Sequence, residues 1–210
     1  MKEYSSDVAF SPSVKEVQAE RGSRGAYARV EQNGGFETEV DDRLRTILAR
    51  MDTVFIATAT VDGQPYIQHR GGPKGFVRAV DEHTVGFVDF AGNRQYVTTG
   101  NLRDNDRVCL LFMDYARRAR VKVWGTARAV PATDELLARL MPEGYRARPE
   151  QVVLVSVSAW DVNCPQHIPQ KLDAAEVIET VTALEARIAE LERENKRLRE
   201  TTNLSAGRIR

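Results

Sequence analysis

The stretch TVFIATATVDGQPYIQHR, residues 53–70, decides the fold class. Two runs rich in β-branched and aromatic residues, 53–61 and 64–70, flank the dipeptide Asp62-Gly63. An Asp-Gly pair between two such runs is a strong hairpin signal, because these residue types tolerate the positive φ of a tight turn. The stretch therefore predicts two antiparallel strands joined by a tight turn.

Five further β-rich runs follow the hairpin, with short polar or glycine breaks between most of them. They are GFVRAV (75–80), HTVGFVDF (83–90), RVCLLFMDY (107–115), RVKVWGTARAV (120–130) and QVVLVSVSAW (151–160). Several short strands at this spacing are typical of an antiparallel barrel or sandwich. The chain is therefore expected to be mainly β.

Three short helices are expected beside these strands. Apolar residues recur at helical spacing over residues 40–51. A second helix is predicted to begin near Asn93 or Arg94 and to stop at Gly100. Thr133 is a plausible N-cap for a third, across TDELLARLM.

Composition narrows the function classes. Thirty basic residues balance thirty acidic ones, so the net charge does not point to a nucleic-acid or membrane surface. Two cysteines and three histidines argue against a disulfide framework or a metal cluster. The N-terminus lacks an apolar signal region, and no apolar run approaches the roughly 20 residues that span a bilayer. We expect a soluble, cytoplasmic protein with no metal, no nucleic-acid partner and no membrane partner.

The C-terminal region carries a heptad pattern. Ala174, Val181, Ile188 and Asn195 are spaced seven apart, and so are Val177, Leu184, Leu191 and Leu198. Together they form an a/d stripe over about four heptads, which is typical of a coiled coil. Asn195 at an a position favours a parallel two-stranded register. The alternative is an amphipathic helix that lies back on its own barrel.

The segment DFAGNRQ, residues 89–95, raises the first functional question. A strand end followed by Gly92 and a helix start would present unpaired amide N–H groups to an anion, and Arg94 adds a charged bidentate fork. A solvated polar turn is the alternative. Gln68, His69 and Arg70 end another strand beside two glycines, which suits close approach of a ligand.

A basic segment, YARRARVKVWG, adds a third group of polar residues. By the alternation of a strand, Arg120, Lys122 and Trp124 share one face of the sheet. Cations on a sheet face need a counter-charge, or they protect an exposed edge strand.

These residues resemble the flavin-binding proteins related to pyridoxamine 5'-phosphate oxidase, whose fold is a split β-barrel. The resemblance covers roughly residues 10–170 and is most specific in DGQPYIQHRGGPKGF, VDFAGNRQYVTTGNL and DYARRARVKVWGTAR. It implies a homodimer with two FMN molecules in clefts between subunits. With it, we expect four regions: an N-terminal wrapping segment (1–39), an FMN-binding split-barrel domain (40–172), a coiled-coil helix (173–201) and a disordered tail (202–210).

The resemblance also implies which residues bind the cofactor. The oxidase's phosphate-gripping segment, a small polar residue followed by Arg and Lys, falls on Asn93, Arg94 and Gln95, so the charge of the third position is missing here. A strand-opening Arg of the oxidase is also absent here, and Arg70 or Lys74 is the candidate replacement. The full expected set is Gln68, His69, Arg70, Gly75, Phe76, Val77, Val88, Asp89, Asn93, Arg94, Gln95, Arg120 and Lys122.

The chain departs from the oxidase near its C-terminal end. In place of the oxidase's tryptophan and arginine it has SAWDVNCPQHIPQK, of which Trp160, Asn163, Gln166 and His167 could reach the cleft. His69 and His167 are candidate proton donors or hydrogen-bonded structural histidines. Cys164 is expected to be a packed or neutral thiol.

The function expected from the resemblance is that of an FMN-dependent oxidoreductase. It would transfer a hydride or electrons to or from a small organic substrate at the dimer interface, with a nicotinamide as a possible reductant. The alternative is a non-catalytic flavin-binding or flavin-sensing protein with a coiled-coil dimerisation or docking tail. No catalytic residue is assigned.

Overall fold

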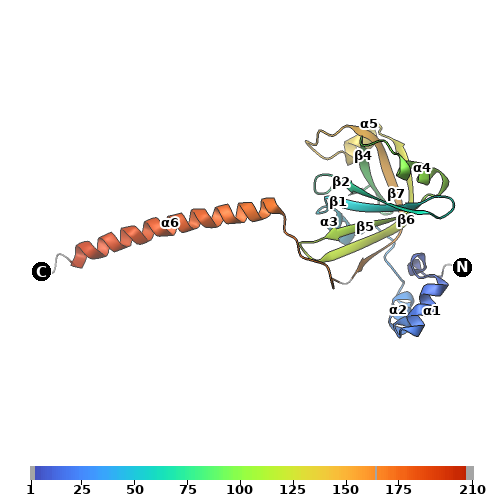
Figure 1. Ribbon diagram of the computed structural model, residues 1–210, viewed down its shortest axis with the longest axis horizontal. Coiled ribbons are helices and arrows are strands. Elements are labelled where there is room, and N and C mark those ends of the chain that lie inside the picture. Colours follow the sequence, from blue (N-terminus) through green and yellow to red (C-terminus); the bar gives the residue numbers. More distant parts are fainter. Residues whose placement is uncertain (1–2, 164, 207–210) are drawn as a thin grey trace. The chain divides into compact units, whose positions relative to one another are not determined.

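The computed structural model of the chain describes residues 3–163 and 165–206 (Figure 1). It divides into two compact units. The first, here called the sheet unit, consists of the chain up to Asp114 together with Arg118–Ile168. The second, the tail unit, consists of Tyr115–Arg117 and the chain from Pro169 onward.

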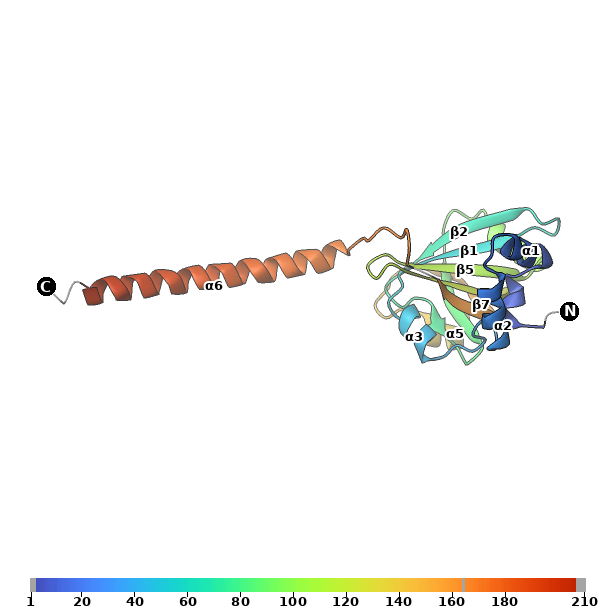
Figure 2. The same cartoon turned by 90° about the horizontal axis from the view of Figure 1, so that it is seen from below.

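The sheet unit is built on seven antiparallel strands. They are β1 (Thr53–Ala59), β2 (Pro65–Gly71), β3 (Arg78–Ala79), β4 (Thr84–Phe90), β5 (Arg107–Asp114), β6 (Ala119–Pro131) and β7 (Pro149–Asn163). Their order in the sheet is β2-β1-β5-β6-β7-β4-β3, and Figure 2 shows β2, β1 and β5 side by side. The sheet curls without closing, because β2 and β3 remain as two edges. This is the expected split-barrel architecture, mainly β with flanking helices.

The predicted hairpin is confirmed. β1 pairs with β2 from Thr53 opposite Gly71 to Ala59 opposite Pro65. Gly63 adopts a φ of 86° in the turn, and its amide donates to the Thr60 carbonyl at 3.0 Å. The turn fixes the register, and the register decides which side chains of β2 face the pocket described below.

Alternation along the strands builds the core. In β1, every second side chain is buried, and the same is true of β5. Buried Ile56, Leu110, Val123 and Val155 belong to one continuous apolar cluster. A smaller cluster under α5 (Asp134–Leu140) includes Val88 and Val152. The core therefore holds the strands rigidly, and their ends carry the polar groups.

The predicted helix over 40–51 is present as α3 (Asp42–Leu48), capped by the Asp41 carboxylate, which accepts from the Leu44 amide at 2.8 Å. The helix after Thr133 is present as α5, and the Thr133 hydroxyl accepts from the Leu136 amide at 3.4 Å. In both cases a short polar side chain satisfies an amide that has no partner within the helix.

The prediction for the helix after β4 was wrong at both ends. α4 spans Val97–Asp104, so it begins after Arg94 and continues through Gly100. Arg94 and Tyr96 have left-handed backbone conformations, with φ of 61° and 53°. A right-handed helix cannot run through such residues, which is why the segment 93–96 forms a loop instead.

The strand predicted over 75–80 is reduced to β3. Gly75 has a φ of 78°, and its amide donates to the Met51 carbonyl at 2.9 Å. Phe76 and Val77 then point into the core, where both are almost fully buried. Only Arg78 and Ala79 are left to pair with β4.

The N-terminal segment contains helical structure that the sequence reading did not anticipate. Its elements are the 3-10 turn η1 (Ser5–Val8) and the helices α1 (Pro12–Glu20) and α2 (Arg24–Gln32). The Lys15 ammonium joins them by ion pairs to Asp7 at 2.7 Å and to Glu31 at 3.0 Å. The end of the segment reaches the sheet, because the Phe36 ring stacks on Trp124 at 5.4 Å between centroids.

The tail unit contains α6 (Ala174–Ala206). The helix begins one residue after the predicted start and extends beyond the predicted end at 201. Residues 207–210, which also belong to the tail expected to be disordered, lie outside the described residues. Among the helices that the structure describes, none has both the length and the apolar character needed to cross a lipid bilayer.

Candidate functional site

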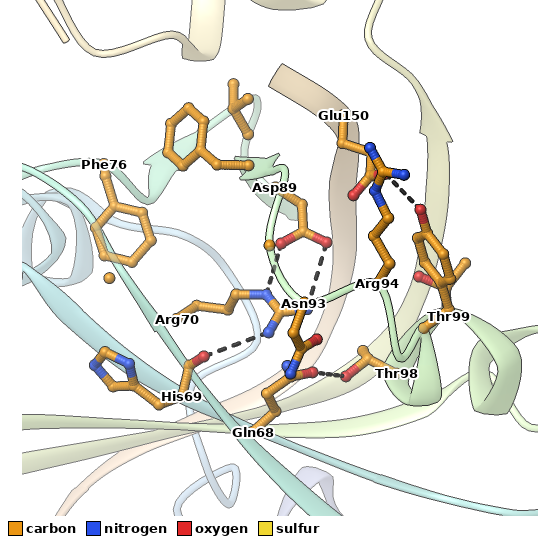
Figure 3. A pocket seen from close by; sticks show the side chains of 15 residues that line it. Gln68, His69, Arg70, Phe76, Asp89, Asn93, Arg94, Thr98, Thr99 and Glu150 are labelled. Atoms are coloured by element: carbon orange, nitrogen blue, oxygen red, sulfur yellow. Dashed lines mark hydrogen bonds and ion pairs between the residues drawn. The ribbon is translucent and has the colours of Figure 1, made fainter. Parts of the chain in front are cut away.

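A pocket of about 320 Å³ opens where the ends of β2 and β4 meet the start of α4 (Figure 3). The loop after β4 forms one wall, and Glu150 of β7 adds a carboxylate to the rim. The lining residues are Gln68, His69, Arg70, Gly71, Phe76, Val88, Asp89, Phe90, Gly92, Asn93, Arg94, Tyr96, Thr98, Thr99 and Glu150. The pocket is thus mostly polar, and Phe76, Phe90 and Tyr96 add aromatic rings to its lining.

An arginine and an aspartate form the buried part of the pocket. The Arg70 Nε atom lies 2.6 Å from Asp89 Oδ1, and an Arg70 terminal nitrogen donates to Asp89 Oδ2 at 3.4 Å. The Nε contact is an ion pair without hydrogen-bond alignment. Asp89 is only 7% exposed, so its charge needs this partner.

Gln151 of β7 fixes the aspartate from the other side. Its amide nitrogen donates to Asp89 Oδ2 at 3.0 Å and to the Thr99 hydroxyl at 2.8 Å. The β4–β7 register places Gln151 opposite Asp89, with an irregularity immediately after it. Gln151 therefore links the strand end to the first turn of α4.

The loop between β4 and α4 exposes a second arginine. The Asn93 side chain accepts from the Gln95 amide at 3.2 Å, which stabilises a local turn. Arg94 follows with its left-handed backbone and an exposed side chain. Among the described residues, no hydrogen bond or ion pair holds the Arg94 guanidinium, so its five donors face the pocket mouth without a protein acceptor.

The start of α4 supplies amide and hydroxyl groups. Its N-cap, Tyr96, makes no side-chain capping bond, so the first amides of the helix have no partner from a cap. Thr98 donates its hydroxyl to Gln68 Oε1 at 2.7 Å, which joins β2 to the helix. The predicted helix start suited to an anion therefore exists at Val97–Thr99, a few residues later than expected.

Tyr96 and Glu150 meet at the rim. The Tyr96 hydroxyl donates to Glu150 Oε1 at 2.6 Å. This hydrogen bond, with smaller contributions from burial and from the carboxylate charge, raises the pKa of Tyr96. The nearby charges of Arg94 and Arg148 act in the opposite direction. The phenol is therefore kept protonated and donates to the carboxylate.

The structure brings eight of the thirteen expected cofactor-binding residues into this pocket. They are Gln68, His69, Arg70, Phe76, Val88, Asp89, Asn93 and Arg94. Gly75, Val77 and Gln95 do not line the pocket; Val77 is buried and Gln95 is exposed. The role of these residues in binding a cofactor stays a prediction.

Arg120 and Lys122 do not line the pocket. They lie on the face of β6 opposite the buried Val121 and Val123, together with Trp124, as the strand alternation predicts. The Lys122 ammonium is 5.9 Å from the centre of the Trp124 ring.

Lys122 also pairs in register with Asp161 of β7. Burial raises the pKa of the Asp161 carboxyl, while a backbone hydrogen bond and then Lys122 lower it. The cations on this face therefore have a carboxylate neighbour within the chain, which is the counter-charge that the sequence reading required.

Trp160 does not reach the pocket. It is fully buried in the main core, and its indole nitrogen donates to the Glu39 carbonyl at 2.7 Å. Its role is structural, so its expected place in the cleft was wrong. The other residues expected to reach the cleft, Asn163, Gln166 and His167, do not line the pocket either. Cys164 lies outside the described residues.

Sequence reasoning missed part of the site. Thr98 and Thr99 lie just after the segment 93–95, which was predicted to bind the phosphate. A correct prediction of the helix start would have added them to the expected site residues. Glu150 and Gln151 carry no local signal, because only the β4–β7 register brings them to the pocket. Among the described residues, no group of His, Cys, Asp or Glu side chains is arranged to hold a metal ion.

Three solved structures resemble the chain at low identity. HupZ from Group A Streptococcus is 18% identical, with 63% of this chain and 98% of that chain covered and a TM-score of 0.48. A putative pyridoxamine 5'-phosphate oxidase from Lactobacillus delbrueckii is 18% identical (60% and 95% covered, TM-score 0.44). An FMN-binding protein from Syntrophomonas wolfei is 11% identical (72% and 95% covered, TM-score 0.46).

The family assignment rests on a different comparison. Among curated protein sequences, none matches the chain. The family model described as "Pyridoxamine 5'-phosphate oxidase" matches residues 40–164. That range contains all seven strands and the whole pocket. Because the match spans more than half of the chain, the protein belongs to the pyridoxamine 5'-phosphate oxidase family.

Proposed function

We propose that the pocket binds FMN and that the protein is an FMN-dependent oxidoreductase acting on a small organic substrate. The observation that carries the proposal is the pairing of an exposed arginine, Arg94, with the uncapped start of α4 at one pocket mouth. A helix start favours an anion through its unpaired amides and its partial positive charge, and an arginine adds a bidentate contact. A phosphate monoester fits this set of donors.

The donors present suit a phosphate better than a carboxylate. Arg94 offers a fork, Thr99 offers a hydroxyl beside the helix amides, and Asn93 offers an amide in the same loop. A phosphate has three oxygens that accept several donors at once, so a convergent set from one loop and one helix turn matches it. The phosphate end of FMN is therefore assigned to the loop at 92–99.

Arg70 compensates only in part for the charge that Gln95 lacks. It is the second arginine in the pocket, and its Nε atom is buried without an aligned hydrogen bond. Its charge is offset by Asp89, so the pair as a whole is close to neutral. A phosphate dianion bound at the pocket mouth would attract the Arg70 guanidinium, because opposite charges attract strongly across a site of limited solvent access.

FMN would supply hydride or single-electron transfer, and the chain would supply position and charge. Phe76 offers an apolar ring at the pocket side away from Arg94. His69 lines the pocket at the end of β2, but its ring lies 5.6 Å from that of Phe55, on the opposite face of the strand from Gln68 and Arg70. It is therefore a candidate proton donor or acceptor only for a substrate that reaches the outer face of the sheet.

We also propose a homodimer formed through the outer face of the sheet. Phe55 of β1 lies in register with Leu111 of β5, and Leu111 with Lys122 of β6, on the face away from the core. On the neighbouring strand, Ile67 is 61% exposed. An apolar face of this kind is typical of a protein–protein interface. Covering it with a second copy would give Arg120 and Lys122 access to a cofactor site that their own chain does not offer them.

The flavin content of the purified protein tests the proposal. We expect the purified protein to bind oxidised FMN and to show the visible absorbance band of the flavin. We also expect it to oxidise NADH or NADPH when a suitable electron acceptor is present. Failure to bind added FMN would overturn the cofactor assignment. Tight FMN binding without turnover for any nicotinamide reductant would favour the alternative, a non-catalytic flavin-binding or sensing protein.

A further inference from the structure

The helix α6 carries an apolar stripe that is exposed to solvent. Its residues Val181, Leu184, Ile188 and Leu191 are between 45% and 58% exposed. A helix with an exposed apolar stripe is stabilised little by its own sequence in water, because most helix stability comes from packing an apolar face. The stripe therefore calls for a partner surface.

The residues of the stripe favour a pair of helices. The a positions Val181 and Ile188 are β-branched. Three of the four d positions, Leu184, Leu191 and Leu198, are leucines, and the first d position is Val177. β-branched residues at a with leucine at d pack best in a two-stranded coiled coil, and they disfavour trimers and tetramers. The composition of the stripe thus selects the number of strands.

Asn195 favours a parallel, in-register pair. In a parallel pair each a residue faces its own copy, so Asn195 can hydrogen-bond to the second Asn195 across the seam. In an antiparallel pair, a residues face d residues instead. Asn195 would then lie against an apolar side chain such as Leu184, and its amide would be left without a hydrogen-bond partner, which destabilises that arrangement.

Charges beside the stripe favour the same direction. In a parallel pair, Arg187 at a g position faces Glu192 at the following e position of the second copy, and Glu194 faces Arg199 in the same way. In the antiparallel arrangement with Ile188 opposite Leu191, the two flanking e positions bring Glu185 opposite Glu192. Like charges in that position repel, whereas the g positions Arg187 and Glu194 would attract each other in the same arrangement. The parallel pair thus has two attractive contacts, and the antiparallel pair has one attractive and one repulsive contact.

An ion pair within the helix does not prevent this pairing. Arg187 contacts Glu190 of its own chain at 2.5 Å, with about 60% of each side chain exposed. Exposed ion pairs of this kind contribute little to stability. Arg187 is therefore free to exchange Glu190 for Glu192 of a second copy.

We propose that α6 forms a parallel, in-register, two-stranded coiled coil with α6 of a second copy of this chain, with its seam from Val177 to Leu198. The partner is another copy of this chain because each feature complements itself. These features are the apolar seam, Asn195 at an a position and the flanking charges. This inference does not depend on FMN binding. It holds or fails on the tail alone.

Cysteine cross-linking in the full-length chain tests the direction and the register. The background replaces Cys109 and Cys164 by serine, and one cysteine is then introduced as Leu184→Cys at a d position. The matched control is Arg193→Cys, an exposed f position on the same helix. We expect Leu184→Cys to form an intersubunit disulfide on the order of tenfold faster than the control, because a paired seam holds the two thiols at high effective concentration.

A mixture of two variants separates parallel from antiparallel pairing. Val181→Cys and Leu198→Cys, which leave Asn195 in place, are unfolded together, refolded and oxidised, and the cross-linked peptides are identified by mass spectrometry. A parallel pair gives 181–181 and 198–198 links. Abundant 181–198 links would show an antiparallel pair, and equal rates for Leu184→Cys and Arg193→Cys would show that the seam does not exist; either result overturns the proposal.

Discussion

The two arginines of the pocket carry the same charge in different surroundings. The Arg70 side chain is 18% exposed and paired with Asp89, which Gln151 holds in turn. Arg94 is exposed on a loop of left-handed backbone and has no hydrogen-bonding or ion-pair partner among the described residues. The chain thus holds Arg70 in place by its own contacts and leaves Arg94 available to a ligand.

Replacing the available cation should have the largest effect. In Arg94→Ala we expect FMN affinity to fall about 100-fold, because a bidentate charge-assisted contact contributes roughly 3 kcal/mol. The thermal midpoint of the ligand-free protein should stay unchanged, because Arg94 holds no part of the fold. Titration of FMN fluorescence measures the affinity, and Arg29→Ala on α2 is the control. Unchanged FMN affinity in Arg94→Ala would show that the phosphate lies elsewhere.

Breaking the ion pair between Arg70 and Asp89 should raise FMN affinity, whereas Arg94→Ala lowers it. Asp89→Asn removes the carboxylate that neutralises Arg70 and leaves a partly buried charge with a neutral neighbour. We expect the free energy of unfolding of the ligand-free protein to drop by roughly 1–3 kcal/mol, while FMN affinity rises because Arg70 then serves the phosphate alone. Urea denaturation and FMN titration check the two effects, with Glu16→Gln as the control. A variant that loses both stability and FMN would contradict the assigned role of Arg70.

Loosening the support of the pair should have a smaller effect. Gln151→Ala removes two hydrogen bonds, to Asp89 and to Thr99. At about 1 kcal/mol for each bond, we expect the unfolding free energy to fall by about 2 kcal/mol and FMN affinity to change by less than in Arg94→Ala. Loss of FMN as complete as in Arg94→Ala would instead make Gln151 a direct ligand contact.

The contact at the rim should respond to pH. The hydrogen bond to Glu150 raises the folded-state pKa of Tyr96, so the contact is intact while the phenol is protonated and is lost as pH rises through that pKa. In Glu150→Gln we expect the titration midpoint of Tyr96 to move down. The phenolate absorbance difference between each protein and its Tyr96→Phe counterpart measures it. An unmoved midpoint would show that the bond to Glu150 does not control this phenol.

Local signals predicted the parts of the fold that local chemistry decides. The Asp62-Gly63 turn and the Thr133 cap depend on neighbouring residues only, and both are present as expected. The start of α4 was misplaced because Arg94 and Tyr96 adopt left-handed conformations, which end any right-handed helix before Val97. Non-glycine residues give little sign of such a backbone in their sequence.

The candidate site also contains residues that local sequence signals predict and residues that they do not. Arg70, Asp89 and Arg94 end or follow strands that the sequence revealed, so they could be named in advance. Glu150 and Gln151 reach the pocket through strand pairing across the sheet, which no short stretch encodes. Trp160 was misassigned because an aromatic residue near a strand end gives no indication of which face it occupies until the register is known.

The central claim is that the pocket recognises FMN through its phosphate at Arg94 and the start of α4. The most direct test is the ratio of the affinities of the unmodified protein for FMN and for riboflavin, which has the same ring without the phosphate, measured at one salt concentration. Our account predicts that FMN binds about 100-fold more tightly, because the phosphate contacts contribute roughly 3 kcal/mol. Equal affinity for the two would contradict it.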